Sequence, residues 1–373
     1  MEVKKHDRNI EVLMATYNRH ENTRVPIKFA ADDQVWVAEI KENFYNFYKN
    51  PRVHLKGLLA GQKWERDNLE ADQPKSYPDI WRVSPRLWMH ENEFFGCDVI
   101  YQQDDYAWAL PLKKNKQDIL DSIQDIYPLE TVRRSEIYKL YLDCKEIAQN
   151  MQFENRRIEV LPPGMGTDGI FTKACEIRGV QQFCEDLLDD PSFAEKLLDI
   201  ITDKTIERIK AWHLLAFGEC RLPYPSFGVA DDSLTLISEE TYRRFVLPRH
   251  ERLYSEMTDG IRRMHLCGHS EQHYRCLHKE LGIARIDGPG TFVDHGLYLD
   301  ELGRNFSIEA QMDNIILKTG TPQQIDEMMR RLLTPHAKKP GRFQIMGFIN
   351  RGTPLQNIRA AYEAGFKYGN IKV

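Results

Sequence analysis

Short apolar, β-rich runs alternate with helical patterns along most of this chain, and this alternation constrains the fold more than any other feature. In the later part of the chain, each run leads through a polar or glycine-containing turn into residues with apolar spacing near 3.6. Strands that alternate with helices form βαβ units, and such units build a parallel sheet. Eight runs have the composition of strands: Val25–Ala31, Cys97–Gln102, Ile158–Leu161, Ser226–Ala230, Arg262–Cys267, Ile283–Ile286, Ser307–Gln311 and Phe343–Phe348.

Eight parallel strands predict an α/β fold of the (β/α)8, or TIM-barrel, type. A barrel can take up most of the 373 residues as one unit, so we expect a single domain over residues 1–373. Residues 34–94 are less regular and include a tryptophan- and proline-rich loop, which we interpret as an insertion that covers the barrel mouth. The alternative is a doubly wound open sheet, which favours a G-x-G-x-x-G turn after its first strand, and we find no such turn.

The later helices carry recognisable start signals. Phe193–Phe217 follows Pro191-Ser192, and Ser238 and Thr321 are predicted to begin two further helices. The other predicted helices are Glu239–Met257, Glu271–Leu281, Pro322–Leu333 and Pro354–Ala364.

Charge and hydropathy exclude several classes of partner. Basic side chains number 51 against 56 acidic ones, and no basic stripe is present, so we expect no nucleic-acid binding. No apolar window reaches the length of a transmembrane helix, and the N-terminus lacks the apolar core of a signal peptide. Seven cysteines, an odd number without dense spacing, indicate a reducing compartment. We therefore expect a cytoplasmic protein that acts on a small molecule and does not bind membranes.

A barrel carries its chemistry at the C-terminal ends of its strands, so these positions select the candidate site residues. Polar residues are also common at exposed strand ends, and we expect part of the set to be bystanders. A neighbouring Asp294-His295 pair in the loop after the sixth strand suggests an acid/base pair. The candidates are Asp32, Gln103, Asp104, Asp231, Asp232, His265, Cys267, Asp287, His295, Gln311 and Asn350.

The sharpest local feature is the H-x-C sequence His265-Leu266-Cys267. Residues two apart on a strand point to the same face, so the imidazole and the thiol lie together. This pair suits zinc. The alternative is a buried strand in which the cysteine acts as a small hydrophobe and the histidine is hydrogen-bonded. The carboxylate of Asp232 can likewise serve as a general acid or base, or simply cap a turn.

Several short motifs follow residue 155 in a fixed order. They are Arg178-Gly179, Ala230-Asp231-Asp232-Ser233, His265-Leu266-Cys267-Gly268, Val293-Asp294, Thr319-Gly320-Thr321-Pro322 and Gly352-Thr353-Pro354. In this order they resemble the uroporphyrinogen decarboxylase superfamily, and most of all its divergent members and corrinoid-linked methyltransferases. The resemblance implies a (β/α)8 barrel, in agreement with the strand pattern. True uroporphyrinogen decarboxylases carry an Arg-Gln-Ala-Gly-Arg-Tyr signature where this chain has Val25–Asp32, so we do not expect porphyrinogen decarboxylation.

The methyltransferase branch binds zinc through an H-x-C motif and a further cysteine near the eighth strand. The last cysteine of this chain is Cys276, so that third ligand is absent or replaced. Stand-ins are Asp287, Asp294, His295 or a carboxylate from another strand end. The resemblance thus implies transfer of a methyl group between a small methoxy, methylamine-type or thiol compound and a corrinoid (cobalamin) protein. It also makes a homodimer reasonable.

The H-x-C-G motif and the polar strand ends lead us to expect the following roles for the candidates. His265 and Cys267 bind a metal or the substrate, Asp232 or Asp104 donates or accepts a proton, and His265 takes part in catalysis. The substrate-binding set is Asp32, Gln103, Asp231, Asp287, His295, Gln311 and Asn350.

Two other functions stay open at this point. A metal-free decarboxylase, or lyase, of a small carboxylic acid needs cationic groups at the barrel mouth, for which the candidates are Arg82, Arg86, Arg178 and Arg351. A non-catalytic ligand-binding homologue is the other alternative, because both the zinc cysteine and the arginine signature are missing.

Overall fold

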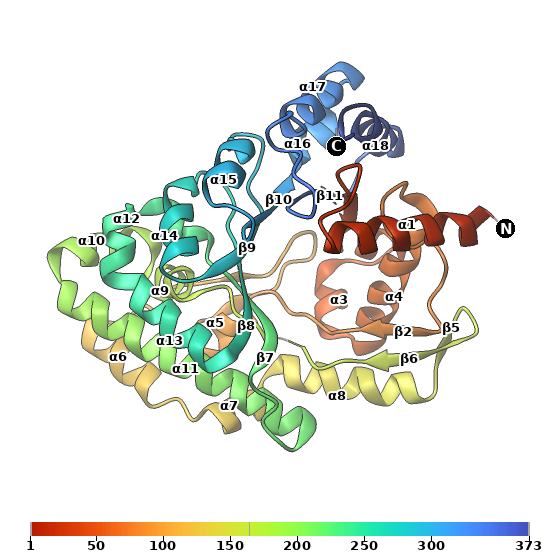
Figure 1. The fold of residues 1–373 in the computed structure, drawn as a ribbon. Helices are drawn as coiled ribbons and strands as arrows, with labels where there is room; N and C mark the ends of the chain where they lie inside the picture. The colour runs from red at the N-terminus through yellow and green to blue at the C-terminus, as the bar shows by residue number, and fades with distance from the viewer. Residues whose placement is uncertain (1, 164, 372–373) are drawn as a thin grey trace.

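A curled sheet of six parallel strands forms the centre of the protein, and its computed structural model describes residues 2–163 and 165–371 (Figure 1). The strand order is β1-β11-β10-β9-β8-β7, and the sheet curls into a half-barrel with helices on its outer side. Two more parallel strands, β2 and β6, pair with each other and complete a set of eight. This confirms the predicted (β/α)8 type of fold. The bounds are β1 (Ile27–Ala31), β2 (Ile80–Val83), β6 (Arg156–Val160), β7 (Tyr224–Ala230), β8 (Thr258–His265), β9 (Ile283–Asp287), β10 (Ser307–Gln311) and β11 (Phe343–Ile349).

The predicted second strand is wrong. Cys97–Gln102 contains only β3 (Val99–Ile100), which pairs antiparallel with β4 (Trp108–Ala109) in a separate small sheet. The second parallel strand is instead β2, which lies inside the segment 34–94 and pairs with β6. A last short strand, β5 (Gln152–Phe153), pairs antiparallel with β6. Part of the segment interpreted as an insertion therefore supplies a strand.

Side chains complete the edge of the six-stranded sheet at β1. The backbone N–H groups of Ile27 and Ala31 donate to the carboxylates of Asp72 and Glu65, each at 2.7 Å, and that of Phe29 donates to the Gln73 side chain at 3.3 Å. An edge strand exposes such donors, and here these side chains satisfy them. At the opposite edge, Thr167 forms an isolated parallel bridge with Val229 of β7.

The helices begin where the sequence signals predict. Ser238 and Thr321 accept hydrogen bonds from backbone N–H groups at their helix starts, and Thr321 forms a capping box with Gln324. The predicted helix Glu239–Met257 is divided by a π-helical turn, η2 (Tyr242–Val246), just before Pro248. Proline has no N–H to donate, so the regular bonding pattern is interrupted there.

The helices before β7 are α1 (Glu2–Asn18), α2 (Asp33–Glu39), α3 (Phe44–Lys49), α4 (Pro51–Asn68), α5 (His90–Phe94), α6 (Lys116–Gln124), α7 (Pro128–Arg134), α8 (Glu136–Gln149), α9 (Ile170–Arg178), α10 (Val180–Asp189) and α11 (Pro191–Phe217). Those after β7 are η1 (Asp232–Leu236), α12 (Glu239–Thr241), α13 (Leu247–Met257), η3 (Glu271–His273), α14 (Tyr274–Lys279), α15 (His295–Glu301), α16 (Asn314–Thr319), α17 (Pro322–Leu332) and α18 (Leu355–Tyr368). Among the described residues, no helix is both long and apolar enough to cross a membrane.

Candidate functional site

The inner face of the six-stranded sheet is polar along β9 and β10. Along β9 and β10, buried Ile286, Ile308 and Ala310 alternate with half-exposed charged or amide side chains. Successive side chains on a strand point to opposite faces, so the apolar set packs against the helices and the polar set lines the inside of the curl. A TIM-barrel interior is usually filled with bulky branched residues. This one instead leaves polar groups accessible.

A cavity of about 320 Å³ opens on this inner face. The chemistry-bearing side chains of β8 and β9 line it together with residues of α5 and of the segment after β6: His90, Asp168, Gly228, Arg263, His265 and Asp287. A larger hollow of about 630 Å³ lies at α8 and β6, where Tyr141, Arg157 and Leu161 line it. We assign the site to the smaller cavity, because His265 and Asp287 line it together with the titratable side chains of His90 and Asp168.

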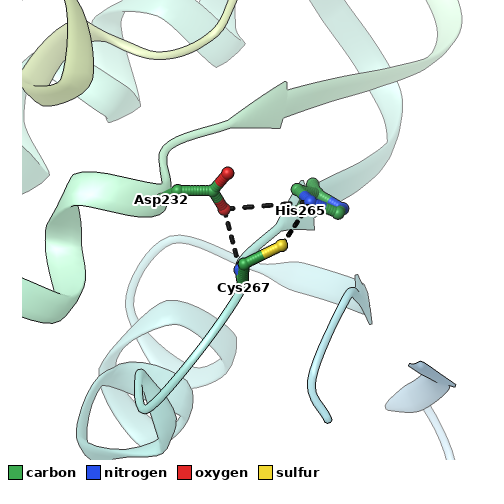
Figure 2. A group of neighbouring side chains, drawn as sticks. All are labelled: Asp232, His265 and Cys267. Carbon is green, nitrogen blue, oxygen red and sulfur yellow. Dashed lines mark hydrogen bonds and ion pairs between the residues drawn. The ribbon is translucent and has the colours of Figure 1, made fainter. Parts of the chain in front are cut away.

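Asp232, His265 and Cys267 converge from two neighbouring strands (Figure 2). His265 is the last residue of β8, Cys267 follows two residues later, and Asp232 begins η1 directly after β7. His265 Nε2 lies 3.1 Å from Cys267 Sγ and 3.8 Å from Asp232 Oδ1. The backbone N–H of Cys267 donates to Asp232 Oδ1 at 2.7 Å, which fixes the carboxylate beside the thiol. Three potential ligand atoms thus lie within 4.8 Å of one another.

The 3.8 Å between His265 Nε2 and Asp232 Oδ1 fits a tetrahedral metal ion, whereas the 3.1 Å between Nε2 and Cys267 Sγ is shorter and would have to widen when a metal binds. Ligands bound at about 2.0–2.3 Å in a tetrahedron lie roughly 3.3–3.8 Å apart. The donor set of one imidazole, one thiolate and one carboxylate suits zinc, and three protein ligands leave a fourth position for a substrate. The amide oxygen of Gln311 lies 3.9 Å from Cys267 Sγ, next to this cluster.

Asp287 orients His265 from behind. Its Oδ1 lies 2.6 Å from Nδ1 of the imidazole, so Nδ1 carries a proton and Nε2 faces the thiol and Asp232. Metal-binding histidines usually have such a carboxylate partner. Burial lowers the pKa of His265, but the hydrogen bonds with Asp287 and Cys267 outweigh burial and raise the pKa to about 11. A metal ion must therefore displace a proton when it binds here.

Of the stand-ins expected for the third zinc ligand, the three named residues lie elsewhere, and the carboxylate from another strand end is the one that the geometry favours. Asp287 bonds the far nitrogen of His265, and Asp294 caps α15 by accepting from the Leu297 N–H at 3.1 Å. His295 is buried against Phe343, where burial lowers its pKa to about 4. The carboxylate that reaches the histidine and the cysteine belongs to Asp232.

Asp231 is fully buried and does not face a substrate. Its carboxylate accepts from the backbone N–H groups of Phe171 and Thr172 at the start of α9 and bonds His250 Nε2 at 2.9 Å. These bonds use both oxygens and tie β7 to two helices. Asp231 is therefore a structural residue, which corrects the substrate-binding role predicted for it.

The remaining predicted residues lie elsewhere at the strand ends. Gln103 and Asp104 are exposed on the loop between β3 and β4, outside the parallel sheet. They do not end a barrel strand, since the strand predicted before them does not belong to the parallel sheet. Asp32 caps α2 and accepts a hydrogen bond from the Tyr106 hydroxyl. Asn350 follows β11, and its side chain forms no hydrogen bond within the described part of the chain.

The four arginines considered for a lyase do not line the cavity beside His265. Arg82 pairs with Glu159, Arg86 with Asp33 and Arg178 with Asp186, while Arg351 is exposed. These four arginines therefore do not supply the cationic groups at the cavity that a lyase of a small carboxylic acid would need.

Sequence reasoning missed His90 and Arg263, which line the cavity together with Asp168, a residue whose position at the end of the third predicted strand had marked it as a candidate. Burial lowers the pKa of His90, whose Nε2 is buried without a hydrogen-bond partner in the described residues. Burial raises the pKa of Asp168, but the charge of Lys173 at 3.2 Å outweighs burial and lowers it. Arg263 had a signal in the sequence, since it lies two residues before His265 on the same strand. His90 had none.

Comparisons with known proteins agree with the fold. A family model described as Uroporphyrinogen decarboxylase (URO-D) matches residues 89–368. A curated relative, the methylated-thiol–coenzyme M methyltransferase of Methanosarcina mazei, is 31% identical over 199 residues, which is 52% of this chain and 50% of that protein. The match thus spans about half the length of the relative. A solved structure of a methyltransferase from Methanosarcina mazei superposes with a TM-score of 0.64 at 16% identity, covering 95% of this chain and 97% of its own, and so shows the same fold.

Proposed function

The chain belongs to the uroporphyrinogen decarboxylase (URO-D) family, and from this membership and the site geometry we propose that it is a metal-dependent methyltransferase. It transfers a methyl group between a small sulfur compound and a corrinoid protein. The observation that carries the proposal is the convergence of Asp232, His265 and Cys267 around one point at the ends of β7 and β8. The relative named as a methylated-thiol–coenzyme M methyltransferase supports the reaction class.

Each ligand has a defined task in this proposal. Asp232, His265 and Cys267 would hold a zinc ion, which supplies Lewis acidity and favours the thiolate form of a bound thiol. Asp287 keeps the proton on Nδ1 of His265, so that Nε2 is free to bind. Gln311, next to the thiol of Cys267, is placed to orient the substrate.

The chemistry balances as a simple displacement. In one direction, the thiolate held beside His265 and Cys267 would take up the methyl group that the corrinoid protein supplies, and the corrinoid would keep the electron pair of the bond that breaks. The proton of the free thiol leaves when the thiol binds in the cavity. His90 lines the same cavity, and its Nε2, which has no hydrogen-bond partner among the described residues, is a candidate acceptor for this proton.

Apolar side chains at the same end of the sheet provide the docking surface for the corrinoid protein in this proposal. Leu236, Phe292, Ile315 and Leu355 follow β7, β9, β10 and β11, and their exposed fractions are 53%, 70%, 74% and 45%. Large apolar side chains gathered around a site mark a protein interaction surface. All four follow the C-terminal ends of their strands, the same ends that carry Asp232 and Cys267.

Elemental analysis of anaerobically purified protein tests the proposal first. The wild type should hold one zinc ion per chain, and His265→Ala and Cys267→Ser should lose both the metal and methyl transfer to or from cobalamin. The matched control is Cys220→Ser, which removes an exposed cysteine away from the site and should change neither. Protein that binds no metal, or metal-loaded protein that transfers no methyl group with any cobalamin form, contradicts the proposal.

A further inference from the structure

Two cysteines on neighbouring helices lie side by side, and the proposed reaction uses neither of them. Cys175 is buried on α9 and Cys184 is half-buried on α10, and their side chains are hydrogen-bonded to each other. Neither residue lines the cavity beside His265. Two thiols in contact, one of which solvent reaches, have the arrangement of a redox-active pair.

A sharp corner between the two helices brings these thiols together. Gly179 ends α9 and begins α10, so a single residue connects the helices, and its φ of 98° favours glycine. The rings of Phe171 and Phe183 pack across the corner with their centroids 5.5 Å apart. Phe171 lies one helical turn before Cys175, and Phe183 directly precedes Cys184. The packing of the rings therefore holds the two thiols against each other.

The half-buried thiol is the more reactive of the pair. The hydrogen bond with Cys175 lowers the pKa of Cys184 to about 7, although burial raises it. The same bond, together with burial, raises the pKa of Cys175. Since the thiolate is the nucleophile in disulfide exchange, Cys184 is suited to attack an oxidant first and Cys175 to resolve the product.

Cys175 also contacts the segment that carries the proposed metal ligand Asp232. Its thiol is hydrogen-bonded to the side chain of Ser233, and the Ser233 backbone N–H donates to the Thr172 hydroxyl at 3.1 Å. Thr172 and Cys175 both belong to α9, and Ser233 directly follows Asp232 on η1. A shift of α9 would therefore be transmitted to the Asp232 carboxylate.

We propose that Cys175 and Cys184 form a reversible disulfide that weakens metal binding at Asp232. The disulfide is independent of the proposed function, whereas its effect on the metal rests on that function. An S–S bond of about 2.05 Å is shorter than any contact between two free thiols, so the sulfur atoms must move toward each other. This movement disturbs the contact of Cys175 with Ser233.

A small-molecule disulfide is the oxidant in this proposal. The Cys184 thiolate attacks one sulfur of the oxidant, so that a mixed disulfide forms and one small thiolate leaves. Cys175 then loses its proton to solvent, and its sulfur attacks that of Cys184 and expels the second small thiolate. The two protein thiols together lose two electrons, and the oxidant is reduced to two thiols.

Peptide mapping locates the bond. Trypsin cleaves after Lys173, Arg178 and Lys196, so the peptides 174–178 and 179–196 each carry one of the two cysteines. Zinc-loaded protein is treated with oxidised glutathione, and the remaining thiols are alkylated before digestion. We expect these two peptides to be linked to each other and to separate on reduction. Cys184→Ser should give no linked species, whereas the matched control Cys220→Ser, which removes an exposed cysteine, should give the wild-type result.

Competition of zinc-loaded protein with a chromophoric chelator tests the effect on the metal. Oxidation should lower the zinc affinity of the wild type and of Cys220→Ser by about 10- to 100-fold, the range for lost support around a metal ligand, and reduction should restore it. The affinity of Cys184→Ser should be the same before and after oxidation.

Three results overturn the inference: no linked peptides, a mixed disulfide on Cys184 that Cys175 does not resolve, or equal zinc affinity of the reduced and the linked wild type. Reduced wild type that binds no zinc contradicts the proposed function instead. Peptide mapping of the metal-free protein then still decides whether the disulfide forms.

Discussion

Removal of the Asp287 carboxylate should weaken metal binding without removing a metal ligand. Asp287 bonds His265 Nδ1 at 2.6 Å and is 28% exposed, so the contact is charge-assisted but partly screened by solvent. Loss of such a second-shell partner usually lowers metal affinity by about 10- to 100-fold, or about 1.4–2.7 kcal/mol. Asp287→Asn keeps an acceptor oxygen and should fall near the lower value, whereas Asp287→Ala should fall near the upper one.

The pH dependence of this loss follows from the competition between metal and proton. The same carboxylate helps to raise the pKa of His265 to about 11, so in the wild type a proton competes with the metal up to that pH. In Asp287→Ala the imidazole holds its proton less tightly, and the competition ends at a lower pH. The ratio of wild-type to variant affinity should therefore be smallest at low pH and should approach the full 10- to 100-fold only as the pH is raised toward the pKa of His265.

Competition against a chromophoric chelator at several pH values measures the affinities. The matched control is Asp294→Asn, which removes a carboxylate charge at the same end of the sheet but only changes the cap of α15. Wild-type affinity in Asp287→Ala would refute the reasoning. An equal loss in Asp294→Asn would assign the effect to general electrostatics rather than to orientation of His265.

Two further predictions concern stability. Burial lowers the pKa of His54 from an ordinary 6.5 to about 4, and its neutral ring bonds the Phe47 carbonyl through Nδ1 and the Arg86 N–H through Nε2. As the pH falls, His54 is therefore protonated in the unfolded chain before it is protonated in the folded protein. The free energy of unfolding should decrease by up to about 3 kcal/mol between pH 6.5 and pH 4. Urea unfolding of His54→Gln should show a weaker pH dependence than the wild type. Arg208→Met leaves the buried carboxylate of Glu91 without its partner and should cost about 3–5 kcal/mol in the same assay, against little change for the exposed control Arg133→Met. A pH profile of His54→Gln that matches the wild type would contradict the first prediction, and equal stability of the two arginine variants would contradict the second.

Alternation of strands and helices was sufficient to predict seven of the eight parallel strands. The second strand escaped because Ile80–Val83 is only four residues long, includes Arg82, and lies between Pro78 and Pro85, so it has the local features of a loop. Its strand conformation comes from pairing with β6, which lies more than seventy residues later in the chain. The β-rich run at Cys97–Gln102 matched the local pattern better but has no parallel partner.

The same distinction separates the site residues. His265 and Cys267 share a face through local alternation, which a sequence shows directly. Asp231 and Asp232 are neighbours at the end of β7, and the sequence could not tell which one turns toward the site. The structure buries Asp231 on His250 and brings Asp232 to His265. Gln103 and Asp104 were selected only through the wrong second strand.

The identity of the third ligand follows from strand register rather than from any motif. Ala230 of β7 pairs with His265 of β8, so two residues further along each segment Asp232 comes to lie beside Cys267. The backbone N–H of Cys267 then donates to the Asp232 carboxylate and holds it in place. Relatives of the corrinoid-linked branch are expected to supply a second thiolate from the eighth strand, whereas this chain offers a carboxylate from the strand next to the H-x-C motif. Both ligands carry one negative charge, but a carboxylate is a harder donor and gives less electron density to a metal than a thiolate does. The proposed site should therefore be the stronger Lewis acid and should polarise a bound sulfur more strongly, which suits it to removing a methyl group from a thioether as well as to activating a thiol.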